Sequence, residues 1–450
     1  MNSAGAAPFS SIDVALAAGL PAAPARPRLL LVCPTPWEEA AMAAPAIQER
    51  FEILRCADEL REISPWKTLR FRTADYLDRL AARVRPLGIV GVIGCGDYPG
   101  CLLAAGLAER LGLPGPALST IVRMGHKAES RKVQARVVPE ATPAFVELSP
   151  LARTVAPLRY PCFVKPVRGS LSWRAQRVER AADLRPALRW SAREAISVWT
   201  VLWPYGQMLR EVQVPGRAIW NFIAEEPLQG CQVTVEGFVQ QGEITVMGVV
   251  DSVMFPGTIS FRQFDYPSVL PDGVTGRMVD IARRLVAGAG LDHTCFNIEM
   301  FYDEGTDQIR IIEMNPRMAY QFSDLYLLVD GLSSMEVQVC LSTGVKVPWH
   351  PRAGAWGAAT SFVGRRFVDG RVRRVPSAAE IAAVSARFPT AHTEVLCKVG
   401  DQLSKLPQDM ASFRYCITNL AAPTRDQLMA DYAVVEQMLP YEFDDLPSGA

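Results

Sequence analysis

Residues 295–317, CFNIEMFYDEGTDQIRIIEMNPR, contain two apolar runs joined by the polar segment DEGTDQ. This pattern predicts a β-hairpin. Glu299 and Glu313 lie on its two arms, at the fourth place of FNIEMF and of RIIEMNP, and Asn315 follows two residues later. Residues i and i+2 share one face of a strand, so two carboxylates and an amide can converge. Such oxygen ligands suit Mg²⁺, although an edge strand with solvated glutamates explains the same pattern equally well.

The first part of the chain alternates short apolar runs with helical patterns, which predicts an α/β doubly wound unit. The expected strands are 28–33, 51–56 and 88–93, and the expected helices are 37–50, 73–84 and 101–115. The turn GCGDYPG is not a GxGxxG motif, and no acidic residue follows at the distance that would hold a ribose. A plain strand-to-helix turn at the carboxyl end of a sheet is therefore favoured over a dinucleotide site.

Strands dominate the rest of the chain, which predicts an α+β core. After a basic helix over 123–136, we expect strand–loop–strand at 160–179, a strand in 218–230 and a hairpin over 231–253 with Gln241-Gly242 as its turn. A helix near 273–289 precedes the 295–317 hairpin, and two strands and a helix near 424–438 follow it. The predicted organisation is a flexible leader (1–26), an α/β domain (27–120), a core (121–345, with a lid subdomain at about 158–227) and a C-terminal domain (346–450).

Composition excludes several classes of protein. Lys plus Arg and Asp plus Glu both number 47, so net charge offers no argument for a nucleic-acid partner. The 10 cysteines include no CxxC pair, which favours reduced, buried thiols in a cytoplasmic protein. No apolar run reaches the ~18 residues of a membrane span, and no basic stretch precedes the apolar part of the N-terminus as in a secretory signal.

Two lysines stand where a phosphate could be bound. Lys165 ends the apolar run CFVK and precedes a loop that contains Gly169, so its ammonium group could reach a phosphate that loop N–H groups cover. A lysine that extends from a strand end into water explains this position as well. Lys127, in GHK, has the same two interpretations.

The order of these motifs is more specific than any one of them. IEMNPR after a strand that carries NIE, a strand that ends in Lys-Pro, and the turn EE-x-x-x-G occur in an order and spacing that resembles the ATP-grasp superfamily over roughly 90–440. The chain is most similar to the carboxylate–amine (amino acid or dipeptide) ligase branch. GDYPGCLLAAGLAERLGLPGP, HKAESR, VPEATP, TVEGFVQQGEITVMGVVDS and IIEMNPR carry this likeness. The resemblance implies an N-terminal α/β domain, a split ATP-grasp core with a lid, and a small C-terminal α+β domain.

The resemblance also implies roles for individual residues. Lys127 and Lys165 match the lysines that bind ATP phosphates, 168–172 matches the lid loop, and 225–228 matches the hinge that holds adenine. The full cofactor-binding set is Lys127, Lys165, Arg168, Gly169, Ser170, Ser172, Glu225, Glu226, Leu228 and Gln232. Gln232 is a departure, since a glutamate often holds the ribose there. The lid loop also departs, with one Gly and a Trp.

The implied reaction activates a carboxylate as an acyl phosphate and condenses it with an amine, releasing ADP and phosphate. Glu299, Glu313 and Asn315 match the residues that bind Mg²⁺, for which Mn²⁺ could substitute, and Arg317 and Lys165 match catalytic residues. Arg317, Tyr320 and Arg262 are the candidate substrate residues, although Arg262 is explained as well by a surface position. The resemblance allows a homodimer.

Two alternatives stay open. A biotin-carboxylase-like or purine-pathway member of the superfamily would share these motifs, although the chain lacks the AMKM sequence of a biotin carrier. A nucleotide-binding scaffold without activity is the other alternative, and the intact set from Glu299 to Arg317 argues against it.

Overall fold

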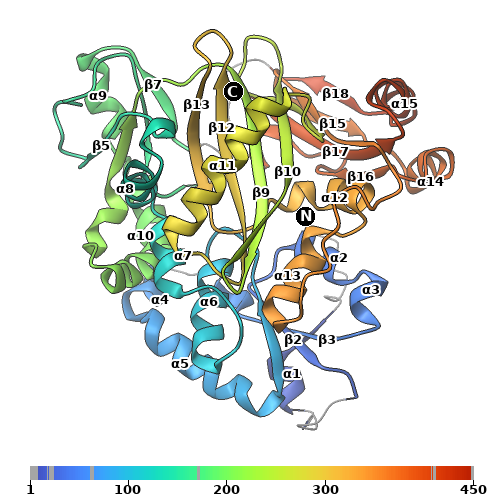
Figure 1. The fold of residues 1–450 in the computed structure, drawn as a ribbon, viewed down its shortest axis with the longest axis horizontal. Helices are drawn as coiled ribbons and strands as arrows, with labels where there is room; N and C mark the ends of the chain where they lie inside the picture. Colours follow the sequence, from blue (N-terminus) through green and yellow to red (C-terminus); the bar gives the residue numbers. More distant parts are fainter. Residues whose placement is uncertain are drawn as a thin grey trace.

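The computed structural model describes residues 9–17, 19, 25–60, 65–169, 173–406, 408 and 412–446. It has a parallel sheet in the N-terminal part, a long antiparallel sheet that extends to the C-terminal part, and a small antiparallel sheet at the side of the long one (Figure 1). Two strands, β15 (Gly370–Arg374) and β18 (Glu442–Asp445), pair separately. Among the described residues, no helix combines the length and the apolar character needed to cross a membrane.

The N-terminal sheet has the order β1-β3-β2-β4 and is parallel throughout. Its strands are β1 (Ser10–Ser11), β2 (Arg28–Val32), β3 (Glu52–Cys56) and β4 (Ile89–Ile93), and its helices include α1 (Ile12–Ala17), α4 (Pro65–Arg70), α5 (Thr73–Val84) and α6 (Gly100–Leu111). Every residue of β2 is buried, as expected of a parallel strand covered on both faces. The α/β prediction for this region is confirmed.

Two helices predicted as continuous are each divided in two. The 37–50 helix is α2 (Pro36–Met42) and α3 (Pro45–Gln48), because proline lacks an N–H and forces the preceding Ala44 out of the helical conformation. The 123–136 helix is α7 (Leu118–Met124) and α8 (Lys127–Val137). His126 separates them with an extended backbone, and its Nδ1 accepts the Glu129 N–H at the start of α8.

The small sheet has the order β5-β8-β6-β7. Its strands are β5 (Phe145–Leu148), β6 (Cys162–Pro166), β7 (Gln176–Val178) and β8 (Phe222–Glu225), and its helices are α9 (Ala181–Leu188) and α10 (Ala192–Met208). The strand predicted within 218–230 is therefore shorter than its apolar pattern. Ser170 and Ser172 of the predicted lid loop lie outside the described residues.

The long sheet has the order β13-β12-β9-β10-β11-β14-β17-β16 and is antiparallel. Its strands are β9 (Cys231–Gln240), β10 (Glu243–Met254), β11 (Phe261–Tyr266), β12 (Thr294–Asp303), β13 (Gln308–Asn315), β14 (Ala358–Arg366), β16 (His392–Val395) and β17 (Phe413–Ala422). The helices α11 (Asp272–Ala289), α12 (Ser323–Asp330), α13 (Ser334–Thr343), α14 (Ala378–Arg387) and α15 (Arg425–Met438) complete this part. Both predicted hairpins are present. The sheet continues past residue 345, so the predicted core and C-terminal domain share it.

Side chains of α8 and β6 bridge the small sheet and the β13 edge of the long sheet. Arg131 of α8 donates to the Ile312 carbonyl on β13 and pairs with Glu225 on β8. The turn after β4 approaches the same region from the N-terminal sheet, through Asp97. Elements of the three sheets therefore meet at one cleft.

Candidate active site

A cavity in this cleft is lined by side chains from α8, β6, β8 and β13, among them Lys127, Lys165, Glu225 and Glu313. Lys127 is the first residue of α8, and its own N–H donates to the Val167 carbonyl after β6. Its Nζ lies 2.8 Å from Glu313 Oε1 and donates to the Gly169 carbonyl at 2.9 Å. Lys127 thus joins the start of the predicted lid loop to the candidate metal strand.

Lys165 belongs to a buried charge cluster. Its Nζ lies 2.7 Å from Glu225 Oε2, and Arg131 pairs with the other oxygen of the same carboxylate. Burial by itself would raise the pKa of Glu225, but Arg131 and Lys165 hold that pKa at about 2. Glu225 is therefore ionised at neutral pH, and two cations share its charge.

Glu299 and Glu313 face each other across the β12–β13 hairpin because of a β-bulge. Met300 pairs with Ile311, whereas Glu299 pairs with Glu313, so Ile312 is the extra residue. Without the bulge, Glu299 would stand opposite Ile312. The Ile312 carbonyl instead accepts from Arg131 at 2.7 Å and from Lys165 at 3.4 Å.

The two carboxylates have pKa values that shift in opposite directions. Burial, and then the charge of Glu313, raise the pKa of Glu299 to about 7. Burial also acts to raise the pKa of Glu313, but Lys127 and Lys165 outweigh it and lower that pKa. A divalent cation between the two would favour the ionised form of both, so their placement fits a metal.

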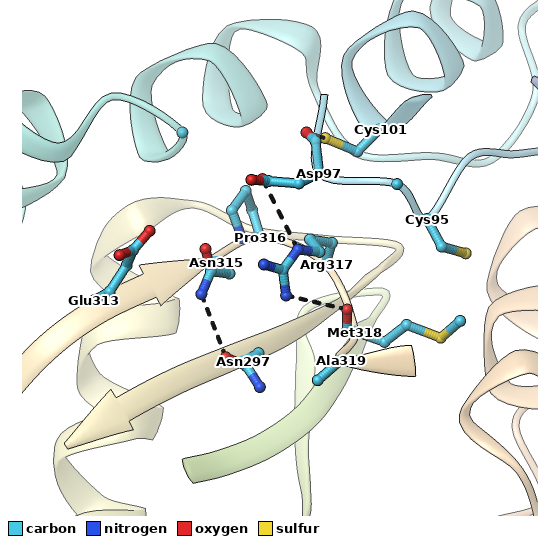
Figure 2. Close-up of polar contacts among 12 residues, drawn as sticks. Cys95, Asp97, Cys101, Asn297, Glu313, Asn315, Pro316, Arg317, Met318 and Ala319 are labelled. Atoms are coloured by element: carbon cyan, nitrogen blue, oxygen red, sulfur yellow. Dashed lines mark hydrogen bonds and ion pairs between the residues drawn. The ribbon is translucent and has the colours of Figure 1, made fainter. Parts of the chain in front are cut away.

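Magnesium fits these residues better than a transition metal does. Within the described part of the chain, no group of three or more His, Cys, Asp or Glu side chains is placed to hold a metal ion. Two carboxylates and the Asn315 amide are the nearby oxygen donors, and Mg²⁺ is commonly held by one or two carboxylates with water and phosphate as further ligands. Figure 2 shows Glu313 and Asn315 next to each other on β13, with the oxygen of each side chain on the same side of the strand.

Arg168, after β6, and Arg317, after β13, share Asp97. Arg168 Nη2 lies 3.3 Å from Asp97 Oδ1. Arg317 Nε lies 3.8 Å from the same oxygen (Figure 2). Burial would raise the pKa of Asp97, but the two arginines, with Lys127, lower it to about 2. Tyr98 and Tyr205 place their rings 5.8 and 5.2 Å from the Arg168 guanidinium carbon, which favours a fixed position for that arginine.

Most of the predicted site residues lie together in or around this cleft. They are Lys127, Lys165, Arg168, Gly169, Glu225, Gln232, Glu299, Glu313, Asn315 and Arg317. Gln232 donates from Nε2 to Glu299 Oε2 at 3.1 Å, so it lies against a candidate metal ligand. Glu226 and Leu228 lie in the link between β8 and β9, where the Glu226 N–H already donates to the Ala144 carbonyl.

Arg262 and Tyr320 are not brought into this cluster. Arg262 is exposed on β11, which is three strands away from β12 in the sheet order. The strand register aligns Glu299 of β12 with Tyr266 of β11, and Arg262 lies four residues from Tyr266 along the strand. At ~4.8 Å per strand and ~3.3 Å per residue, that is roughly 14 Å across the sheet and 13 Å along it. Tyr320 is 46% exposed, and its ring centroid lies 4.7 Å from that of Trp37.

Four further polar residues of the cleft were not predicted from the sequence: Asp97, Arg131, Glu236 and Asn297. Asp97 lies in GDYPG and Arg131 in HKAESR, and both motifs were recognised without a role for these side chains. Glu236, in TVEGFV, is a glutamate within a mostly apolar predicted strand, as Glu299 is in FNIEMF. That pattern is the signal that could have identified it.

Comparison with known proteins agrees with this architecture. Residues 158–324 match the family model of the ATP-grasp domain, while a search of curated proteins finds no match. An L-amino acid ligase from Bacillus licheniformis has a similar structure, with a TM-score of 0.66 and 17% identity over 94% of this chain and 100% of that chain. N5-carboxyaminoimidazole synthase from Aspergillus clavatus, solved with ADP, has a TM-score of 0.61 and 14% identity over 92% of this chain and 98% of that chain. The biotin carboxylase domain of a Hydrogenobacter thermophilus 2-oxoglutarate carboxylase, solved with MgADP, has a TM-score of 0.60 and 14% identity over 93% of this chain and 91% of that chain.

Proposed function

We propose that this chain, which has the ATP-grasp fold and matches the ATP-grasp domain model over residues 158–324, is a member of the ATP-grasp superfamily and an ATP-dependent ligase that joins a carboxylate to an amine. In the proposed reaction a carboxylate oxygen attacks the γ-phosphorus of ATP, and the bond from that phosphorus to the β–γ bridging oxygen breaks to release ADP. The amine nitrogen then attacks the acyl carbon, and the carbon–oxygen bond to phosphate breaks. The proton from the nitrogen leaves with phosphate as hydrogen phosphate.

The observation that carries the proposal is the convergence of charges from separate segments on one cleft. Lys127 and Lys165 come from α8 and β6, Glu299 and Glu313 from the β12–β13 hairpin, and Arg317 from the loop after β13. Phosphoryl transfer requires positioning and stabilisation of charge more than any nucleophilic side chain, and these residues can supply both.

The proposed metal site consists of Glu299, Glu313 and Asn315, with Mn²⁺ as an alternative to Mg²⁺. A bound Mg²⁺ would supply positive charge that offsets the negative charge of the ATP phosphates. Lys127 Nζ lies 2.8 Å from Glu313 Oε1 and would bind a phosphate oxygen beside that metal site.

The remaining residues of the chain would bind and orient the reactants. Lys165 would hold a phosphate oxygen, and Glu225 and Ile312 keep its ammonium group in position. Arg317 would face the acyl phosphate, and the link 225–228 would hold adenine through its main chain. The loop over 168–172 would cover the phosphates, which excludes water from an intermediate that otherwise hydrolyses.

The name of the Bacillus licheniformis neighbour, an L-amino acid ligase, supports amino acids or similar small metabolites as substrates. A bicarbonate-dependent reaction is the alternative favoured by the biotin carboxylase neighbour. A cytoplasmic location, a homodimer and the domain boundaries given above, which assign the lid to about 158–227, complete the proposal.

The test uses the purified protein with ATP, Mg²⁺ and pools of carboxylates and amines, and measures ADP release and new product masses. We expect ADP and a mass equal to carboxylate plus amine minus water, only when both pools are present. ADP formation that requires bicarbonate would identify the carboxylase alternative. Binding of ATP without turnover in any pool would favour a nucleotide-binding scaffold and overturn the ligase proposal.

A further inference from the structure

Three buried polar side chains form a row across adjacent strands behind the candidate metal site. They are Glu236 on β9, Asn297 on β12 and Asn315 on β13, with 2%, 3% and 5% of their surface exposed. The strand register places Asn297 opposite Glu236 on one side and opposite Asn315 on the other. Asn297 Nδ2 donates to Glu236 Oε1 at 2.9 Å, and Asn315 Nδ2 donates to Asn297 Oδ1 at 3.3 Å (Figure 2 shows the second bond).

The carboxylate at one end of the row determines the direction of both amides. Glu236 Oε1 accepts the Ala319 N–H and therefore acts as an acceptor, so Asn297 must turn its NH₂ group to this oxygen and its own oxygen to Asn315. Asn315 must then turn its own NH₂ group into the row, which leaves its oxygen pointing outward. Figure 2 shows that oxygen on the side away from Asn297, where the Glu313 carboxylate also points. Reversal of either amide would leave buried donors and acceptors unpaired.

The same carboxylate also holds the segment that follows Arg317. Glu236 Oε1 accepts the Ala319 N–H at 2.6 Å, two residues after that arginine. Arg317 in turn donates from Nη1 to the Met318 carbonyl at 3.2 Å. One buried oxygen therefore contacts both the row that ends at Asn315 and the loop that carries Arg317.

We infer that Glu236 is a positioning residue which, through Asn297, fixes the Asn315 amide with its oxygen directed at the metal. The inference rests on the proposed function, because it takes Asn315 as a Mg²⁺ ligand. Glu236 is buried, is not one of the proposed metal ligands, and would act through Asn297. Its contribution is to keep the ligand oriented before Mg²⁺ and ATP arrive, as partners of metal ligands commonly do.

The test measures the dissociation constant of ATP by titration calorimetry, once with Mg²⁺ and once with EDTA, for the wild type and two variants. Glu236→Met keeps the length of the side chain but accepts no hydrogen bond. We expect it to weaken binding of Mg²⁺·ATP by about 10- to 100-fold and to leave binding of ATP in EDTA within about two-fold. Glu236→Gln can place its carbonyl oxygen where Oε1 lies, so we expect it to retain the wild-type Mg²⁺ response.

Asp265→Asn serves as the control, because Asp265 is a buried carboxylate of the same sheet that accepts from Thr360, Gln263 and Arg425 and from no site residue. It should lower the melting temperature without changing the Mg²⁺ response. Should Glu236→Met fail to fold, Asn297→Ala interrupts the row at its centre and should show the same loss.

The outcomes distinguish the inference from the proposed function. A wild-type Mg²⁺ response in folded Glu236→Met, or in Asn297→Ala, would overturn the inference alone. Equal losses in Glu236→Gln and Glu236→Met would also overturn it, because the charge rather than the acceptor would then be required. If the wild type itself shows no Mg²⁺-dependent binding of ATP, the proposed function fails, and the inference fails with it.

Discussion

Glu225 and Glu299 face the same cleft, yet their pKa values move in opposite directions. Glu225 lies on the small-sheet side, where Arg131 and Lys165 contact its two oxygens and lower its pKa to about 2. Glu299 lies on the long-sheet side, where burial and the neighbouring Glu313 raise its pKa to about 7. Both begin from the same ordinary value, so the difference comes from the charges that the fold places around each.

The comparison shows how the two sides of the cleft divide their tasks. On the small-sheet side, Arg131 and Lys165 already neutralise the Glu225 carboxylate, whose Oε2 lies 2.7 Å from Lys165 Nζ. On the long-sheet side, two facing carboxylates leave negative charge that a bound cation would compensate. Titratable groups that are pushed in opposite directions commonly mark functional sites.

The largest expected effect comes from removing a carboxylate on the long-sheet side. We expect Glu313→Ala to reduce ADP formation by more than about 100-fold, because changes to mere neighbours of metal ligands already cost 10- to 100-fold. The measurement is coupled-assay turnover with saturating Mg²⁺, alongside circular dichroism to confirm the fold. Glu304→Ala, at the exposed tip of the same hairpin, is the matched control. Full activity of Glu313→Ala would refute the metal assignment.

The next largest effect is a loss of stability when the buried ion pair on the small-sheet side is broken. Arg131→Met leaves Glu225 with Lys165 as its remaining partner, and breaking a buried ion pair costs about 3 kcal/mol of unfolding free energy. Urea denaturation measures this loss. Lys132→Met on the same helix removes an exposed cation, whose pairs are worth about 1 kcal/mol or less. Equal losses in the two variants would show that the Glu225 cluster is not a stabilising unit.

Much of the long-sheet side could be predicted, because its elements are local in sequence. The β12–β13 hairpin, with Glu299 and Glu313 on its two arms, follows from two apolar runs and a polar turn. The bulge at Ile312 does not, since one extra residue leaves the apolar pattern intact while changing which residues face each other.

The small-sheet side was harder to predict, because its contacts join distant segments. Arg131 and Glu225 are 94 residues apart, and Arg168 and Asp97 are 71 apart. From the sequence alone, a basic residue of a helix such as Arg131 can be either exposed to solvent or part of a buried site. Only the packing of α8 against β8 and β13 shows that Arg131 is buried. For the same reason, the pairing of β14 with β11, which brings C-terminal strands into the long sheet, was not foreseen.

A smaller effect tests the pKa contrast directly. Glu299 must lose its proton to bind a metal, so affinity for Mg²⁺·ATP should fall as the pH drops below about 7, by roughly five-fold between pH 7 and pH 6. Glu225 stays ionised across this range and adds no pH dependence, so binding of ATP in EDTA at each pH is the reference against which the Mg²⁺-dependent change is measured. Calorimetric titrations at both pH values measure this. A flat profile for Mg²⁺·ATP would contradict the raised pKa.

The same residue makes an opposite prediction for stability without metal. The folded-state pKa of Glu299 lies above its ordinary value of 4.5. Protonated Glu299 therefore contributes to the free energy of unfolding in full below pH 4.5, and this contribution is lost as the pH rises through about 7. Glu299→Gln removes this loss. In EDTA, the melting temperature of the variant relative to the wild type should therefore rise from pH 5 to pH 8. Added Mg²⁺ and ATP at pH 8 should stabilise the wild type more than the variant.

The smallest expected effect is at Arg262, a candidate substrate residue on sequence grounds. It is exposed on β11, and this strand lies roughly 14 Å across the sheet from β12, which carries Glu299. Arg262→Ala should leave kcat and the KM for the carboxylate within about two-fold of the wild type, because exposed substitutions away from a site have small effects. Arg317→Ala, at the cleft, should instead lose most turnover. A large rise in KM for Arg262→Ala would show that the substrate extends from the cleft along the long sheet toward β11, and would relocate the substrate pocket accordingly.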